Sequence, residues 1–205
     1  MYRFGDLMFT DAVKAAQEKM GSRAAYAEVQ AKGERDFELG ENERAFIEER
    51  DHFFMATVSE TGWPYVQHRG GPAGFVRVLD RARFAFPDFR GNRQYLSVGN
   101  LAGNDRAAFI FMDYAAKARL KALRTLRLVD KDEDPELMAT LALTGYKAAV
   151  ERAIVVTVAA LDWNCPQHIT PRLTEEELAA AIAPLREKMA RLEAENAELR
   201  AKLGD

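Results

Sequence analysis

Short apolar runs alternate with polar turns through the middle of the chain, and this pattern predicts a domain built mainly of β-strands. Residues 107–112 form a continuous apolar run, as a strand buried on both faces does, and residues 153–161 are rich in β-branched side chains. Further strands are predicted at residues 53–58, 63–68, 75–79 and 83–86, and as two pieces within 117–129. Only brief helices interrupt them, one of them predicted at residues 135–143, so the order favours a barrel over an alternating β–α sheet.

The first 50 residues have helical patterns. Thr10 and Asp11 can begin a helix that Gly21 ends, residues 23–32 form a second, alanine-rich segment, and a third starts at residue 42 or 43. The first two are too short to be stable alone, so we expect them to pack on the barrel or on another chain. The predicted organisation is a helical extension at 1–50, a barrel at 51–172 and a C-terminal helix at 173–205.

The C-terminal helix carries a seven-residue repeat. Its two interleaved apolar rows are Leu178, Leu185, Leu192 and Leu199, and Ile182, Met189, Asn196 and Leu203. Leucine at every d position with a single asparagine at an a position favours a parallel two-stranded coiled coil in fixed register. The alternative is an amphipathic helix folded back on its own domain. Pro184 is expected to kink or restart the helix.

The connection between residues 84–86 and 107–112 is more specific than a plain loop. Pro87 is predicted to end the first of these strands, and Arg90, Gly91, Asn92 and Arg93 follow. Asn92 can cap a short helix that begins at residues 93–96 and ends near 99–100. A helix N-terminus preceded by glycine and flanked by arginines is suited to bind an anion. The alternative is a capped surface helix with two solvated arginines, which composition alone favours.

The order of these motifs resembles the pyridoxamine 5'-phosphate oxidase-like, FMN-binding split-barrel family. The similarity rests on Arg90-Gly91-Asn92-Arg93, on Ser97 with Gly99-Asn100-Leu101, on Asn104-Asp105-Arg106 before the apolar strand, and on the hairpin at residues 52–72. It covers roughly residues 50–172. The resemblance implies a mainly β fold with α extensions, an FMN-binding split β-barrel, and a homodimer with FMN at the subunit interface.

The resemblance also implies which residues contact FMN. Arg90 and Arg93 are expected at the phosphate, with Asn92, Ser97, Asn100 and Leu101 of the same motif nearby. Strand alternation places Gln67 and Arg69 on one face and His68 on the other, so we expect the first two to face the flavin. In the segment after the last strand, Trp163, Asn164, Gln167 and His168 are candidates for reaching the flavin of the other subunit. Without the resemblance, this segment reads equally well as a connector.

Composition narrows the other possibilities. A net charge of −3 argues against a general nucleic-acid binder. The single cysteine, Cys165, excludes an internal disulfide and a cysteine-based zinc site, and the three histidines lack metal-ligand spacing, so no metal is expected. We find no secretory signal and no run long enough to cross a membrane, and the simplest interpretation is a cytoplasmic protein.

The reaction is less well indicated than the cofactor. The family's oxidases end in a basic segment that helps to hold their substrate, whereas here Arg172-Leu173 is followed by Thr174-Glu175 and an acidic helix. No residue stands out as an essential acid or base. The first hypothesis is therefore an FMN-dependent oxidoreductase of unknown substrate. The alternatives are a flavin-binding module without turnover, such as a redox or stress sensor, and a split barrel that binds haem or a deazaflavin.

Overall fold

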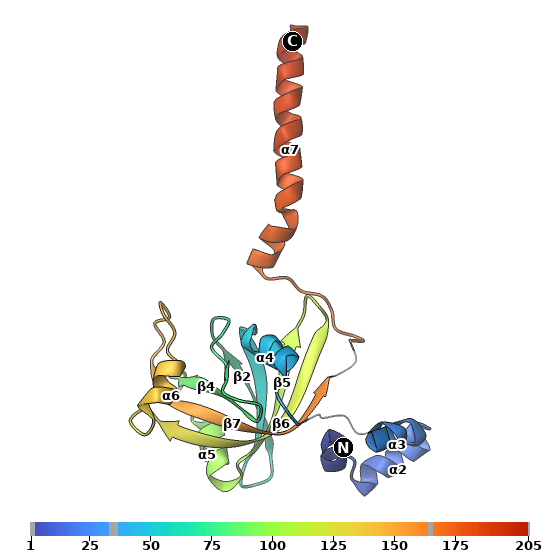
Figure 1. Ribbon diagram of the computed structural model, residues 1–205, viewed down its shortest axis with the longest axis vertical. Helices are drawn as coiled ribbons and strands as arrows, with labels where there is room; N and C mark the ends of the chain where they lie inside the picture. Colours follow the sequence, from blue (N-terminus) through green and yellow to red (C-terminus); the bar gives the residue numbers. More distant parts are fainter. Residues whose placement is uncertain (1–2, 33–36, 164–165, 205) are drawn as a thin grey trace. The chain divides into compact units, whose positions relative to one another are not determined.

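The computed structural model describes residues 3–32, 37–163 and 166–204. The chain divides into two compact units, residues 1–113 with 118–167 and residues 114–117 with 168–205. The first unit contains a seven-stranded antiparallel sheet in the order β2-β1-β5-β6-β7-β4-β3, which curls without closing (Figure 1). The strands are β1 (His52–Val58), β2 (Pro64–Gly70), β3 (Arg77–Val78), β4 (Arg83–Phe89), β5 (Arg106–Asp113), β6 (Ala118–Asp130) and β7 (Val150–Trp163). The mainly β split barrel expected from the sequence is confirmed.

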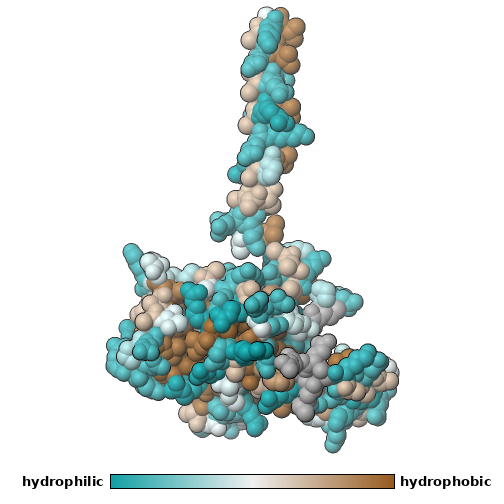
Figure 2. All heavy atoms as spheres, viewed as in Figure 1, coloured by the Kyte–Doolittle hydropathy of each residue, from teal (hydrophilic) through white to brown (hydrophobic). Residues whose placement is uncertain are grey.

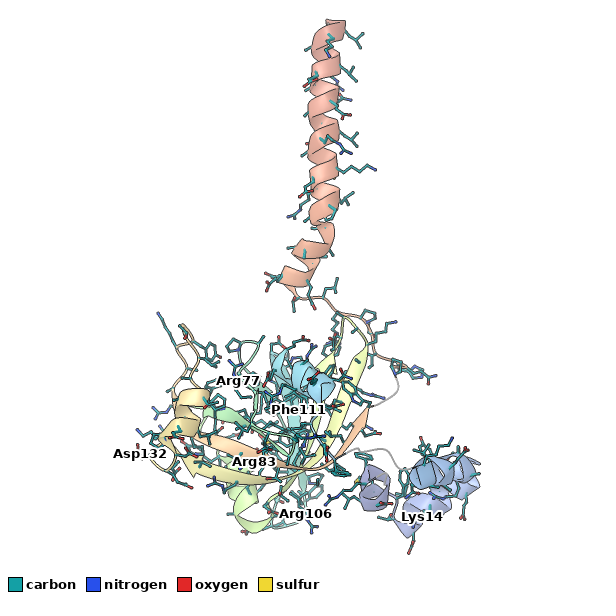
Figure 3. The ribbon with its side chains drawn as sticks, in the orientation of Figure 1. Lys14, Arg77, Arg83, Arg106, Phe111 and Asp132 are labelled. Atoms are coloured by element: carbon teal, nitrogen blue, oxygen red, sulfur yellow. The ribbon has the colours of Figure 1, made fainter. Side chains whose placement is uncertain are left out.

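An aromatic core fills the inside of this sheet. Alternate residues of β1 are buried, as expected for a strand with one face on the core. Phe53 lies at the centre, with ring centroids 4.9 Å from Phe86 and 5.2 Å from Phe111. Phe111, labelled in Figure 3, is fully buried on β5, and Phe109 stacks beside it at 6.1 Å. The core thus fixes β1, β4 and β5, and β4 is one of the strands that line the candidate site.

Three strand predictions need correction. The two pieces predicted within residues 117–129 form one strand, β6, with a register shift between Leu123 and Arg124 that local patterning does not distinguish from a break. Residues 75–79 form only the two-residue β3. Pro87 does not end a strand, because β4 continues to Phe89 and Pro87 pairs with Ala153 of β7. On its other side β4 pairs with β3 only at Phe84 and Ala85, so a residue without an N–H group is tolerated there.

The helices agree more closely with the predictions. α2 (Asp11–Lys19) is capped by Thr10, which accepts from the N–H of Val13, and α3 spans Arg23–Lys32 as predicted. A short α1 (Arg3–Met8) precedes them, and α4 spans Glu41–Glu48. α4 packs on the barrel through fully buried Ile47, and its Glu48 accepts a hydrogen bond from the N–H of Val78 at 2.8 Å. α5 (Leu96–Gly103) and α6 (Pro135–Thr140) lie between strands.

The second unit is dominated by α7 (Glu175–Leu203). Thr174 and Glu177 form a capping box, in which the N–H of Glu177 donates to Thr174 Oγ1 at 3.1 Å. The helix is continuous through Pro184 and bends in its first third, the part that contains this proline (Figure 1). Among the residues that the structure describes, no helix combines the length and apolar character needed to cross a membrane.

Candidate functional site

The loop between β4 and α5 differs from the predicted helix start. α5 begins at Leu96 rather than near Arg93, and it runs on to Gly103 rather than ending at 99–100. Asn92 caps a turn instead of a helix: its Oδ1 accepts from the N–H of Gln94 at 3.1 Å. Arg93 and Tyr95 both adopt left-handed backbone conformations, with φ of 63° and 54°. Such conformations cost non-glycine residues roughly 1 kcal/mol each, and they are concentrated at functional sites.

This loop closes one side of a hollow of about 180 Å³ against the barrel. Strand β2 contributes Gln67 and Arg69, β4 contributes Asp88 and Phe89, and β7 contributes Glu151. The loop and the start of α5 contribute the remaining lining residues, among them Asn92, Arg93 and Ser97. A second hollow of about 180 Å³ adjoins it, sharing Gln67, Arg69, Phe89 and Gly91 and adding Arg90. The predicted alternation of β2 agrees with the first hollow, which Gln67 and Arg69 line and His68 does not, whereas all three residues line the second hollow.

A buried carboxylate organises the floor of the hollow. Asp88 is 4% exposed, and its Oδ1 accepts a hydrogen bond from Nη1 of Arg69. Its Oδ2 lies 3.9 Å from Nη1 of Arg152, the residue opposite it on β7. Both arginine side chains are largely buried, so this carboxylate compensates two cations that water reaches poorly.

A second carboxylate holds the rim. Glu151 Oε1 accepts from Nε of Arg90 at 3.0 Å and from the hydroxyl of Tyr95 at 3.1 Å. The hydrogen bond from Arg90 is the main reason that the pKa of Glu151 is lowered from its ordinary value. Arg152 also lies over the ring of Tyr95, 5.6 Å from its centroid. These contacts tie the left-handed part of the loop to β7.

Two polar residues of α5 face the sheet rather than solvent. Ser97, 1% exposed, donates to Oε1 of Gln67 at 2.9 Å, and Asn100 donates to Oγ1 of Thr57 at 2.9 Å. Ser97 and Asn100, three residues apart, therefore share one face of α5. Only Ser97 lines the hollow; Asn100 anchors α5 to β1, and Leu101 belongs to the apolar core.

The hollow retains donors that nothing in the described chain uses. Nε of Arg69 is buried without a hydrogen-bond partner among the described residues. Within the same residues, the guanidinium of Arg93 makes neither an ion pair nor a hydrogen bond. Nothing lies within 4 Å of the position that a Cβ on Gly91 would occupy, so open space adjoins its backbone.

The charges at the hollow do not balance. Four arginines and two carboxylates lie in it or pair with residues that line it, which leaves an excess of two positive charges. The arginines are Arg69, Arg90, Arg93 and Arg152, and the carboxylates are Asp88 and Glu151. Such a site, with free guanidinium donors, suits a phosphate or another multiply charged anion. In the described ranges, no group of three or more His, Cys, Asp or Glu side chains is placed to hold a metal ion.

Of the residues predicted to reach a flavin from the end of the barrel, the described ones, Trp163, Gln167 and His168, do not line the hollow within one chain. Trp163 donates from Nε1 to Glu43 at 2.8 Å and packs edge-on against Phe46, with ring centroids 4.7 Å apart. Gln167 is exposed in a turn, and His168 adopts a left-handed conformation at the start of the second unit. Asn164 lies outside the described residues. Contact between this segment and a flavin in another subunit stays a prediction.

Sequence reasoning missed the acidic half of the site. Asp88, Glu151 and Arg152 are not among the predicted residues, because the predicted strands end at 86 and begin at 153, short of the observed β4 and β7. Tyr95, in the loop before α5, is not predicted either. The sequence feature that could have revealed them is the charged residues next to two apolar segments. Asp88 follows residues 84–86, and Glu151-Arg152 precede residues 153–161. Antiparallel pairing of these segments brings those charges together.

A family model described as pyridoxamine 5'-phosphate oxidase matches residues 39–163, more than half of the chain. No curated protein matches the chain. Among solved structures, the chain is similar to a putative pyridoxamine 5'-phosphate oxidase from Lactobacillus delbrueckii, at 16% identity and a TM-score of 0.48, over 62% of this chain and 96% of that one.

The chain is also similar to two solved structures whose names give different ligands. One is an FMN-binding protein from Syntrophomonas wolfei, at 14% identity and a TM-score of 0.46, over 72% of this chain and 97% of that one. The other is the heme storage protein HutZ from Vibrio cholerae, at 14% identity and a TM-score of 0.39, over 61% of this chain and 94% of that one.

Proposed function

The chain belongs to the pyridoxamine 5'-phosphate oxidase family, and we propose from this premise that it binds FMN in the hollow beside residues 90–95 and acts as a flavin-dependent oxidoreductase. The observation that carries the proposal is the unbalanced positive charge of this hollow. A phosphate monoester carries close to two negative charges at neutral pH, which matches the excess of two. FMN has such a phosphate.

We place the phosphate near Arg93, which has no partner in the described chain, and near the buried Nε of Arg69. Arg90 joins them from the rim: it donates to Glu151 through Nε, so its two terminal nitrogens remain for the ligand. Asp88 and Glu151 act as positioning residues, because they hold Arg69, Arg90 and Arg152 in place before the ligand arrives. Preorganised guanidinium groups lose less conformational entropy on binding.

The amide of Gln67 faces the same hollow from β2. Its Oε1 accepts from Ser97, so its Nε2 is directed to other acceptors and supplies a donor for the carbonyl and nitrogen edge of a flavin ring. When bound, FMN supplies the electron or hydride transfer, and the protein orients the ring and tunes its potential through such hydrogen bonds. The proposal assigns no residue as a general acid or base.

We further propose that the FMN site is completed by a second copy of the chain in a homodimer. The segment at residues 163–168 is the part expected to reach the flavin of the other subunit. Two features of one chain support a shared site: the hollow is small, about 180 Å³, and one side of β2 has no strand partner within the sheet.

The identity of the cofactor is tested by denaturing the purified protein and identifying what it releases. FMN supports the proposal, whereas haem or a deazaflavin overturns it. Turnover of a reduced nicotinamide with an electron acceptor then distinguishes an oxidoreductase from a flavin-binding sensor, because only the former consumes the nicotinamide catalytically.

Arg93→Ala should weaken FMN binding about tenfold to a hundredfold while the fold persists. The reason is the loss of one or more charge-assisted hydrogen bonds to the phosphate, worth roughly 1.5–3 kcal/mol. Flavin fluorescence titration measures the dissociation constant. Arg127→Ala is the matched control, since Arg127 is an exposed arginine of β6 that pairs with Glu133 at 2.6 Å and lines neither hollow. Equal affinity of the Arg93 variant and the control would show that Arg93 does not hold the phosphate.

FMN binding and dimerisation should be coupled, because a site formed by two subunits exists only in the dimer. The melting temperature should rise with added FMN, and dilution below the dimer dissociation constant should release the flavin. Analytical ultracentrifugation followed at the flavin absorption band reports both quantities together. A monomer that retains FMN with undiminished affinity would rule out the shared site.

A further inference from the structure

α7 presents an apolar stripe that nothing in its own unit covers. None of its residues is buried, and the leucines at its d positions are about half exposed, from 48% for Leu178 to 59% for Leu185. At the a positions Met189 is 53% and Leu203 79% exposed. Figure 2 shows apolar side chains gathered along one side of this helix, with polar side chains over the rest. A seven-residue apolar repeat on an otherwise polar helix is the pattern of a surface that pairs with another helix.

We propose that this stripe binds α7 of a second copy of the chain in a parallel, in-register, two-stranded coiled coil. In this arrangement every a and d residue faces its own copy, so Asn196 of one helix hydrogen-bonds Asn196 of the other. Leucine at each d position with a single asparagine at an a position is the combination that selects two parallel strands. The proposal identifies an interaction surface separate from the FMN hollow.

The flanking charges support the parallel orientation. In a parallel pair, Lys188 at a g position faces Glu193 at the e position of the other helix, and Glu195 at g faces Arg200 at e. Both pairs are opposite in sign and each occurs twice, because the arrangement is symmetric. Arg186 faces only Ala181, so no like-charged pair is formed.

No antiparallel pairing satisfies both the charges and the core. The register centred on residue 194 brings like charges together at all four flanking positions. Its pairs are Lys188 with Lys202, Arg186 with Arg200, Glu193 with Glu193 and Glu195 with Glu195. A register displaced by one heptad pairs opposite charges but places Asn196 against Leu185, which leaves a buried amide unpaired. Only the parallel register pairs the charges and satisfies Asn196.

Pro184 limits how strongly the helices associate. Because the helix bends in the part that contains it, the regular pairing surface is mainly residues 185–203. A segment this short dimerises weakly by itself. The pairing therefore rests on the proposed barrel homodimer, which raises the effective concentration of one helix near the other. The coiled coil then adds a second contact between the two subunits of that dimer.

The test uses disulfide cross-linking in the full-length chain with Cys165 replaced by serine. Asn196→Cys at an a position should cross-link to its own copy almost completely on mild oxidation, because the two Cα atoms then lie within disulfide range. Ala194→Cys is the matched control, two residues away at an f position on the outside of the pair, and it should remain largely monomeric on a non-reducing gel. A mixture of Leu185→Cys and Asn196→Cys chains carrying different tags reports the antiparallel alternative.

Each outcome of this experiment decides the proposal. Cross-linking of the Asn196 variant at least tenfold faster than of the Ala194 variant supports it. Cross-linking mainly between the Leu185 and Asn196 chains would show an antiparallel pair, and equal slow rates for all variants would show that the stripe binds something else. FMN affinity, measured on the same samples, separates this proposal from the proposed function. If the coiled coil does not form but FMN still binds, the proposed flavin site stands and only the coiled coil is wrong. If neither the coiled coil forms nor FMN binds, the proposed homodimer of barrels is wrong.

Discussion

Replacing Asp88 with alanine should lower the free energy of unfolding by about 3–5 kcal/mol, because it leaves the largely buried guanidinium of Arg69 without a carboxylate and leaves that of Arg152 with Glu151 alone. Asp88 is 4% exposed and is the shared partner of Arg69 and Arg152, whose side chains are 14% and 17% exposed. Removing one member of a buried ionic cluster is costly because the remaining charges stay desolvated. Urea denaturation at neutral pH measures the change.

Glu133→Ala is the matched control for this experiment. Glu133 also pairs with an arginine, Arg127 at 2.6 Å, but both side chains are more than half exposed. Water replaces such a partner readily, so the expected loss is at most about 1 kcal/mol. If the Asp88 variant lost no more stability than the control, the ionic cluster below the hollow would not be formed in solution.

Replacing Arg124 with methionine should have the opposite effect on stability and raise the free energy of unfolding by about 1–4 kcal/mol. Arg124 is 2% exposed inside the barrel, and none of its three guanidinium nitrogens has a hydrogen-bond partner among the described residues. Its guanidinium lies 4.8 Å from the centroid of Phe84, a contact that offsets only part of the cost of burial. Methionine has similar length and fills the same space without a charge.

Arg124 should also make the free energy of unfolding depend on pH. Burial lowers the pKa of Arg124 from its ordinary value to about 9 in the folded chain. Between these two values the unfolded chain holds a proton that the folded chain has released, so the wild-type free energy of unfolding should rise with pH above about 9.

Urea denaturation at pH 8 and pH 10 of the wild type, Arg124→Met and the exposed control Arg127→Met measures this dependence. The rise should be present in the wild type and the control and absent in the Arg124 variant. A loss of stability in Arg124→Met would contradict the account, because it would mean that the guanidinium has a partner that stabilises it.

Local patterning predicted the elements of the fold better than their boundaries. Apolar runs such as 107–112 and 153–161 identify core strands because burial on the sheet requires them. The prediction that Pro87 ends a strand is wrong because a proline is tolerated in β4 where the neighbouring β3 is too short to reach it. The length of β3 cannot be read from the residues next to Pro87. The start of α5 was misjudged for a related reason. Asn92 has the same capping chemistry in a turn as in a helix, and contacts with Glu151 on β7 stabilise the left-handed Tyr95 that delays the helix.

Sequence analysis predicts three of the four arginines of the candidate site and neither of its carboxylates. Arg69, Arg90, Arg93 and Gln67 line one continuous region, as expected. Which arginine is free could not be predicted, because it depends on partners far away in the sequence: Arg90 pairs with Glu151, 61 residues on, while Arg93 pairs with no described residue. Such pairings follow from the β4–β7 register, which is set by the whole sheet.

The central claim is that the hollow beside residues 90–95 holds the phosphate of FMN. It is tested most directly by titrating the cofactor-free protein with FMN and with riboflavin, which has the same ring and ribityl chain but no phosphate, and comparing the wild type with Arg93→Ala. The account predicts that the wild type binds FMN at least about tenfold more tightly than riboflavin, and that most of this preference is lost in the variant while riboflavin affinity is unchanged. Equal affinity of the wild type for both compounds, or a preference that survives the loss of Arg93, would contradict it.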